Sequence, residues 1–109
     1  GLAEYARALG QALQDVGAAT EAAWSTADPA QALANAVPYM QAFGHMVVAW
    51  IWLDVALAIH PDAADIPAQQ GRLRAARYFY RYELPKIGAW LNVAAGRDAT
   101  CASMPPEAF

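Results

Sequence analysis

The sequence predicts an all-α domain, an up-down-up antiparallel bundle of three long helices with an irregular C-terminal tail. Apolar residues recur at helical spacing in three long segments, about residues 2–26, 29–59 and 67–96. Turn-forming residues separate these segments, and such short connections favour antiparallel neighbours. Residues 97–109 have no periodicity and contain two adjacent prolines, so we expect an irregular tail.

The composition indicates one domain, residues 1–109, and suggests that part of its surface is covered. The chain is long enough for one hydrophobic core. Charged residues make up 16% of it, below the roughly 25% that is usual for soluble domains. The net charge of −3 gives no attraction to nucleic acid. Cys101 has no partner for a disulfide and no secretory signal pattern is present, so we expect a cytoplasmic protein.

The first segment predicts a long amphipathic helix. At about 100° per residue, one narrow stripe contains Leu2, Tyr5, Leu9, Leu13, Val16, Thr20 and Trp24. We expect this helix to stop near residues 25–27. Asp28 followed by Pro29 is then a suitable cap and first-turn pair for the next helix.

The second segment has no clean polar face, because MVVAWIWLDVALAI is apolar nearly all round. Such a helix is buried on most sides. Its most apolar stretch, residues 46–59, is shorter than the roughly 20 residues that a membrane span needs, so we expect a core helix and no membrane span. Pro38 should kink or restart the helix. Asp54 should form an ion pair with Arg74 or Arg77, because an unpaired carboxylate among apolar residues is costly.

The third segment follows the break HPDAADIP, in which Asp62 or Asp65 is the expected cap. We expect Pro85 to bend the third helix and Gly96 to end it. Its apolar stripe consists of Leu73, Ala76, Tyr80, Leu84, Ile87, Leu91 and Ala94. Four glycines inside helices each cost about 1 kcal/mol relative to alanine. Close helix approach is the expected reason for Gly10, Gly17, Gly44 and Gly88.

No group of residues predicts a catalytic or metal site. His45 has no second ligand at metal spacing, so we expect a hydrogen-bonded core histidine, and His60 should be an exposed loop histidine. Asp54 as a general acid or base would need a second carboxylate that the sequence does not place beside it. Glu83 should be solvated or act as a cap. The tryptophans should mainly pack in the core, and the alternatives are that they stack a flavin or line a ligand groove.

The stretch RYFYRYELP combines arginines with aromatic residues. Arg74, Arg77 and Arg81 fall at i, i+3 and i+7, with Tyr78 and Tyr82 on the same turns. Basic grooves with aromatic platforms bind single-stranded nucleic acid, but acidic residues outnumber basic ones here by 10 to 7. We therefore expect no nucleic-acid binding, and a charged flank that contacts another domain or subunit.

Three stretches resemble the extra C-terminal helical domain of certain acyl-CoA dehydrogenases, flavoenzymes of the acetyl-CoA dehydrogenase-like and methylmercaptopropionyl-CoA dehydrogenase-like kind. In that family a Tyr-Leu-x-x-x-Gly stretch leads into an apolar helix with tryptophan. An Ala-Arg-Phe/Tyr-Tyr/Phe segment with a later Leu-Pro opens the final helix, and a short motif ends in Phe. The corresponding residues here are Tyr39, Met40 and Gly44, then Trp50 and Trp52, then Ala76, Arg77, Tyr78 and Phe79, then Leu84 and Pro85, and lastly Met104 to Phe109. The family often has lysine where this chain has Arg72 and Arg74, which puts in doubt any role tied to that lysine.

The resemblance implies a non-catalytic structural and interaction domain, the C-terminal fragment of an FAD-dependent acyl-CoA dehydrogenase of fatty acid metabolism. In such oxidoreductases a carboxylate removes the α-proton of an acyl-CoA thioester and the β-hydride passes to the flavin. None of these groups can be located in this fragment. The start at Gly1 without a methionine and the ending at Phe109 agree with an excised domain.

The implied partners are the dehydrogenase body, which binds FAD and acyl-CoA, and further copies in a homo-oligomer. The expected contact residues are Trp50, Arg74, Arg77, Tyr78, Arg81 and Tyr82. Two alternatives remain open. One is a free-standing helical adaptor that dimerises through its second helix, and the other is a bundle that encloses a fatty acyl chain between tryptophans.

Overall fold

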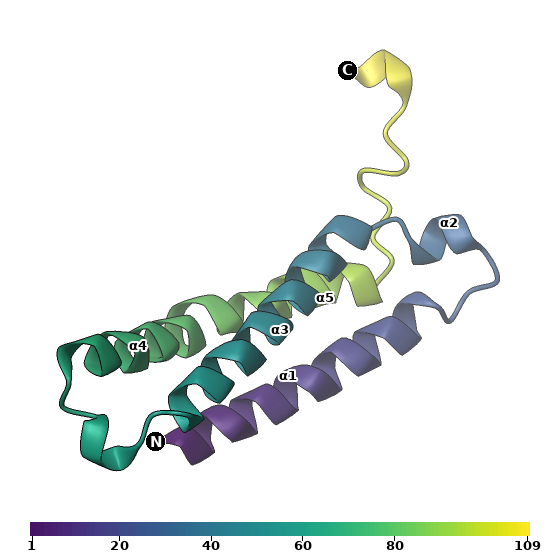
Figure 1. The fold of residues 1–109 in the computed structure, drawn as a ribbon. Helices are drawn as coiled ribbons and strands as arrows, with labels where there is room; N and C mark the ends of the chain where they lie inside the picture. Colours follow the sequence, from purple (N-terminus) through teal and green to yellow (C-terminus); the bar gives the residue numbers. More distant parts are fainter.

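The computed structural model describes all 109 residues, and its regular elements are all helical. The α-helices are α1 (Leu2–Ala23), α2 (Pro29–Ala32), α3 (Ala36–Leu57), α4 (Pro67–Tyr78) and α5 (Ile87–Ala95) (Figure 1). The predicted all-α class is confirmed. A π-helical turn (Phe79–Glu83) and a 3₁₀ turn (Leu84–Lys86) connect α4 to α5, and further 3₁₀ turns lie at Pro61–Ala63 and Pro106–Ala108.

Helix α1, helix α3 and the segment that runs from α4 to α5 lie side by side. Helices α1, α3 and α5 contact one another pairwise, whereas α4 packs on α3. In Figure 1 the chain runs along α1, returns along α3 and runs back through α4 and α5. The Cα atoms span 61 × 29 × 15 Å, so the molecule is elongated and flat. This shape leaves part of each helix without a neighbour in the chain.

Helix α1 has nearly the predicted bounds, and its buried stripe overlaps the predicted one in part. Its buried residues are Ala12, Val16, Ala19 and Ala23. Leu13 and Trp24, which the predicted stripe includes, are 53% and 51% exposed. The prediction is confirmed at Val16, and Leu2, Tyr5 and Leu9 pack against the core. It was wrong at Leu13 and Trp24, because the alanines beside them take the buried positions.

The predicted helix 29–59 is two helices. The Asp28 carboxylate accepts a hydrogen bond from the Ala30 N–H at 3.0 Å, which confirms the predicted cap. Helix α2 is a single turn, and α3 begins at Ala36. Pro38 falls in the first turn of α3, where a missing N–H removes no intrahelical bond. Of the two predicted effects of Pro38, a kink or a restart of the helix, the structure shows the restart.

Helix α3 is 22 residues long and, by length and composition only, is apolar enough to cross a membrane. The expectation of an apolar stretch too short for a span was wrong, because the helix and its apolar residues extend N-terminally of Met46. The core helix of a soluble protein passes the same test. One side of α3 is in the core, where Ala42, Ala49 and Ala56 are fully or almost fully buried.

Helix α4 begins without a side-chain cap. Pro67 is its first residue and Ile66 precedes it, so the predicted capping by Asp62 or Asp65 was wrong. Proline is well suited to the first helical position, where its fixed φ starts the helix and no donor is lost.

The predicted bend at Pro85 is an interruption of the third helix. Pro85 has no N–H to donate to the carbonyl four residues earlier, and its ring crowds that turn. The preceding turn is widened, and the Leu84 N–H bonds to the Phe79 carbonyl five residues earlier. Phe79 and Tyr80, which are adjacent in sequence, are both buried at this wide turn.

Tyr80 joins three elements in the core. Its hydroxyl donates to the Ala49 carbonyl of α3 at 2.7 Å, and its ring stacks on Tyr5 of α1 with centroids 4.5 Å apart. Burial, together with the neighbouring Tyr5, raises the pKa of Tyr80 to about 12. The predicted inward position of Tyr80 is confirmed.

Helix α5 ends in a Schellman motif whose left-handed residue is an arginine. Gly96 caps the helix as predicted but is right-handed, and Arg97 has φ 49°. The Arg97 N–H donates to the Ala94 carbonyl and the Asp98 N–H donates to the Val93 carbonyl, both at 3.2 Å. This backbone conformation costs about 1–2 kcal/mol for a residue with a Cβ.

The Arg97 side chain offsets that cost. Its guanidinium donates to the Ala22 carbonyl and to the Ser25 hydroxyl, each at 2.6 Å, at the end of α1. The Asn35 amide, just before α3, donates to two carbonyls of the same motif at 3.2 and 2.9 Å. These bonds tie together the ends of α1, α3 and α5. Beyond this helix-end junction, made by Arg97 and Asn35, the tail projects away from the helices (Figure 1).

We expect Tyr80→Phe to destabilise the protein by about 1 kcal/mol, because one buried hydrogen bond is lost. Tyrosine is neutral when protonated, and the folded-state pKa of Tyr80 lies above its ordinary value of 10.0. The stabilisation is therefore complete below pH 10 and is lost as the pH rises toward 12. Urea unfolding at neutral and alkaline pH tests this, with Tyr78→Phe as the control. Equal alkaline losses in wild type and Tyr80→Phe would contradict it.

We expect Arg97→Ala to destabilise the protein more than Arg97→Gly, by about 1 kcal/mol. Both variants lose the two guanidinium bonds, but only alanine keeps the left-handed strain. Urea unfolding of the two variants measures the difference. Equal stability of the alanine and glycine variants would show that the backbone of Arg97 is not strained.

Candidate functional site

Five of the six predicted contact residues lie together on α4 and the π turn. Arg74, Arg77, Tyr78, Arg81 and Tyr82 line one shallow hollow of about 430 Å³, which we call the Arg–Tyr surface. All five are exposed. The tyrosine rings stack with centroids 4.9 Å apart and planes 17° apart. Tyr78 and Tyr82 face outward, as predicted.

The three arginines of this surface form no ion pair within the chain. The predicted partner, Asp54, is exposed and its carboxylate forms no ion pair, so the predicted pairing with Arg74 or Arg77 was wrong. Guanidinium groups without an internal carboxylate are available to bind carboxylates or phosphates from outside.

The sixth predicted contact residue, Trp50, lies elsewhere and is 64% exposed. It lines an apolar groove of about 280 Å³ between α1 and α3, together with Leu9, Leu13, Met46 and Val47. No polar side chain lines this groove. Trp50 and the Arg–Tyr surface thus belong to two different surfaces.

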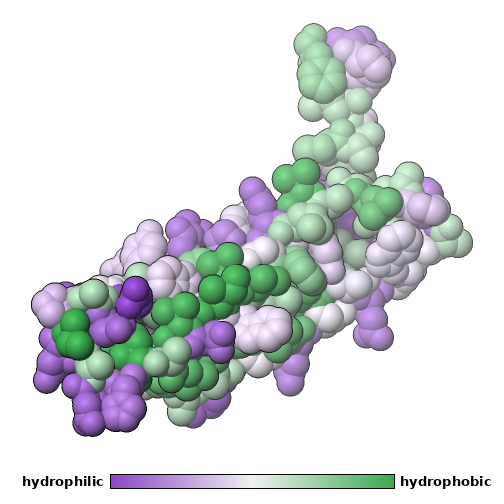
Figure 2. All heavy atoms as spheres, in the orientation of Figure 1, coloured by the Kyte–Doolittle hydropathy of each residue, from purple (hydrophilic) through white to green (hydrophobic).

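The groove continues into an exposed apolar surface, the outer face of α3. Figure 2 shows apolar side chains gathered along the course of this helix. The exposed large apolar residues of α3 are Val37, Met40, Phe43, Val48, Trp50, Ile51 and Leu57. Asp54 lies among them at helical steps of three and four residues from Trp50, Ile51 and Leu57, and α3 contains no other aspartate, glutamate, lysine or arginine.

The helical glycines do not mediate close packing within the chain. A Cβ atom built at Gly10, Gly17, Gly44 or Gly88 has no neighbouring heavy atom within 4 Å. The expected internal close approach at these glycines was therefore wrong. Gly44 is exposed on α3 between Met40 and Val48.

A charged cluster lies between α3 and α5. Glu83 Oε2 is 2.7 Å from Lys86 Nζ and 3.4 Å from His45 Nε2. His45 Nδ1 is 3.1 Å from the Gln41 carbonyl oxygen, and the ring packs against Trp90 with centroids 4.8 Å apart. Since both ring nitrogens face acceptors, only the doubly protonated imidazole donates both bonds. Sequence reasoning expected the hydrogen-bonded His45 but missed Lys86, which the i, i+3 spacing to Glu83 could have indicated.

Hydrogen bonds from Lys86 and, to a smaller extent, His45 hold the pKa of Glu83 below its usual range. The Glu83 carboxylate correspondingly raises the pKa of Lys86. The one carboxylate of the cluster, that of Glu83, is already paired with Lys86, and the cluster contains no hydroxyl or thiol nucleophile. No three His, Cys, Asp or Glu side chains in the chain lie together as metal ligands would. The arrangement can hold α3 against α5, and it offers no acid–base pair.

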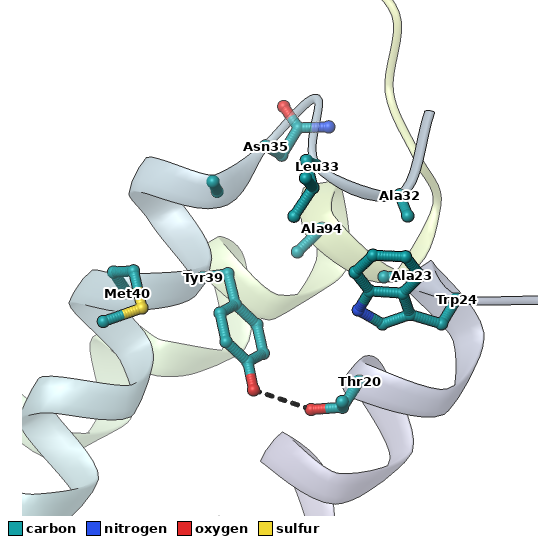
Figure 3. A pocket seen from close by; sticks show the side chains of 10 residues that line it. Thr20, Ala23, Trp24, Ala32, Leu33, Asn35, Tyr39, Met40 and Ala94 are labelled. Carbon is teal, nitrogen blue, oxygen red and sulfur yellow. Dashed lines mark hydrogen bonds between the residues drawn. The ribbon is translucent and has the colours of Figure 1, made fainter. Parts of the chain in front are cut away.

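A second apolar hollow of about 170 Å³ lies where the ends of α1, α2 and α3 meet (Figure 3). Thr20 donates to the Val16 carbonyl at 2.7 Å, so the Tyr39 hydroxyl donates to Thr20 across 2.8 Å at the side of the hollow. Its other lining residues are Ala23, Trp24, Ala32, Leu33, Asn35, Ala36, Met40 and Ala94. A volume of this size accommodates a small apolar group.

The three hollows described above do not fit a flavin. Ligand sites of that size are concave and enclose most of the ligand with side chains from several elements. The most polar hollow, the Arg–Tyr surface, is shallow and comes only from α4 and the adjoining π turn. The apolar groove and the hollow of Figure 3 lack the charged groups that hold phosphates.

We expect Glu83→Gln to lower stability at neutral pH and to reduce the loss of stability in acid. A depressed folded-state pKa contributes stability above the ordinary value of 4.5, and this is lost as the pH falls through the lower folded-state value. Thermal unfolding between pH 7 and pH 3 measures how the stability of each variant depends on pH, with Glu21→Gln, at an exposed position, as the matched control. Identical pH profiles for wild type and Glu83→Gln would contradict the role of this cluster.

Comparison with known proteins identifies the family. A family model described as acetyl-CoA dehydrogenase C-terminal like matches residues 1–105. No curated protein and no solved structure gives a significant match. The match covers nearly the whole chain and confirms the resemblance to the C-terminal domain of acyl-CoA dehydrogenases. The chain therefore belongs to the family of acetyl-CoA dehydrogenase C-terminal-like domains.

Proposed function

We propose that this chain is a non-catalytic structural and interaction domain of an FAD-dependent acyl-CoA dehydrogenase, and that it supports the dehydrogenase body or its oligomer interface. The observation that carries the proposal is the uncovered outer face of α3, in a domain whose family is named for the C-terminal part of such enzymes. Contiguous apolar surfaces of this kind mark interaction sites in proteins.

The exposed apolar residues supply the driving force for docking. Full burial of one large apolar side chain contributes about 1.5–3 kcal/mol. Trp50 and Leu57 are each more than half exposed on this face, as is Leu13 on α1 beside the groove. Trp50 is the natural anchor, because buried aromatic residues dominate the energy of interfaces.

The Arg–Tyr surface is proposed as a second contact, with the body or with another subunit. Arginine and tyrosine are enriched at interfaces, and three guanidinium groups without internal partners suit a carboxylate-bearing surface. The three antiparallel segments would form an up-down-up bundle that presents the two surfaces as one rigid unit.

The chemistry is assigned to the body. FAD would accept the hydride there, and the residues of this chain do not form its site. This makes the complete protein a cytoplasmic flavoprotein and oxidoreductase of fatty acid metabolism, a homo-oligomer that binds acyl-CoA through its body. The catalytic residues would all belong to the body.

A second candidate function is binding of an acyl-chain end, which the apolar hollow in Figure 3 favours. Its volume of about 170 Å³ is close to that of an engineered cavity that binds benzene. The hollow could hold the end of an alkyl chain and not a whole fatty acid. Mass spectrometry of lipid extracted from the purified chain tests this function. A free-standing adaptor that dimerises through α3 is the remaining alternative.

The complete gene product tests the main proposal. We expect a bound flavin with a visible spectrum that bleaches when acyl-CoA is added, because hydride transfer reduces the flavin. A colourless product, or a gene that encodes only this helical domain, would contradict the proposal. Lipid that co-purifies with such a product would instead support the acyl-chain function.

A further inference from the structure

We propose that a helix of the dehydrogenase body packs along the outer face of α3, crosses it closely at Gly44 and places a lysine or arginine opposite Asp54. The inference rests on the function proposed above and names the chemistry of the docking partner. Three independent observations carry it: the shape of the apolar face, the open space at Gly44 and the isolated charge of Asp54.

The shape of the surface fits a helix. The outer face of α3 extends from Val37 to Leu57, about 30 Å at 1.5 Å per residue. Val37, Met40 and Phe43 follow one another at steps of three residues, and Phe43, Trp50 and Leu57 at steps of seven. Both spacings keep side chains on one side of a helix, where a second helix can pack against them. The adjoining groove between α1 and α3 is apolar on both sides and opens along the same face.

Gly44 provides room for a close crossing. Glycine inside a helix is destabilising, and no contact within the chain explains it here, because a Cβ atom at Gly44 would meet nothing within 4 Å. Helix interfaces use small residues to bring two backbones together. A body helix that crosses α3 at this position uses the space that the missing side chain leaves.

Asp54 indicates the charge of the partner. It is the one charged residue of the outer face and has no partner in the chain, and covering it without a cation would be costly. A second copy that packed its own α3 against this face would bring no lysine or arginine to meet it. Insertion of this face into a membrane would place the carboxylate amid hydrocarbon, which is unfavourable. A helix with an apolar stripe and a cation satisfies both requirements.

The experiment compares unfolding temperatures in two preparations, the 109-residue chain and the complete gene product. In the chain alone, Gly44→Ala should raise the midpoint by about 4–8 °C, because alanine favours the helix and meets no neighbour. In the complete product the same variant should lower it, because the added Cβ blocks the crossing. Gly71→Ala, also in open space on α4, is the matched control and should lower neither midpoint.

Asp54→Lys tests the charge. We expect no loss of stability in the chain alone, where Asp54 is exposed and unpaired, and a lower midpoint in the complete product, where lysine would face a cation. Asp65→Lys, on the exposed loop before α4, is the control and should shift neither preparation. Asp54→Asn should fall between wild type and Asp54→Lys in the complete product.

Equal shifts of Gly44→Ala in both preparations, with Asp54→Lys as stable as wild type in both, would overturn the inference. If that product still holds flavin, the proposed function stands and only the docking geometry fails. A colourless product would overturn both. Self-association of the free chain that Gly44→Ala abolishes, or its binding to phosphatidylcholine vesicles, would assign the face to a second copy or to lipid and overturn the body helix.

Discussion

The small side chains at the centre of the fold determine most of its other properties. Where α1, α3 and α5 meet, the buried positions are largely alanines, and Ala42 and Ala49 on α3 are completely inaccessible. Alanine allows helices to approach closely, so the larger apolar residues cannot all fit between them. Leu13, Trp50 and Ile51 therefore lie outside, around the apolar groove and the outer face of α3. The narrow core and the exposed apolar surface are two results of one packing choice.

Two local irregularities hold this thin arrangement in place and orient its surfaces. The wide π turn before Pro85 turns both Phe79 and Tyr80 inward, while Tyr78 and Tyr82 stay outside. The helix-end junction then fixes the opposite end, where one strained arginine and one asparagine satisfy the last carbonyls of α1 and α5. The charged cluster around Glu83 adds a link between α3 and α5. Together these contacts keep the two proposed interaction surfaces in a fixed relation.

Local sequence signals predicted the helices better than they predicted the contacts. The cap at Asp28, the interruption at Pro85 and the inward position of Tyr80 follow from short-range chemistry and could be predicted. The pairing of Asp54 could not, because it was inferred from hydrophobic neighbours that the fold leaves exposed. Helical periodicity also placed Leu13 in the buried stripe of α1, where the fold buries Ala12 and Ala19 instead. Hydropathy ranks leucine above alanine, whereas close packing here favours alanine. The expectation that α3 is buried on most sides was wrong for another reason: a helix that is apolar nearly all round gives no signal of which side the chain itself covers.

The alanine-rich core also affects how the protein responds to temperature. Unfolding exposes less apolar surface than it would from a core of larger side chains, because residues such as Trp50 and Leu57 are already in water. The heat-capacity change of unfolding grows with the apolar area exposed. The stability of this chain should therefore vary gently with temperature and with denaturant concentration, as a shallow curve rather than a sharp dome. Covering the outer face of α3 would steepen both dependences, so the cooperativity of the fold would come partly from its partner.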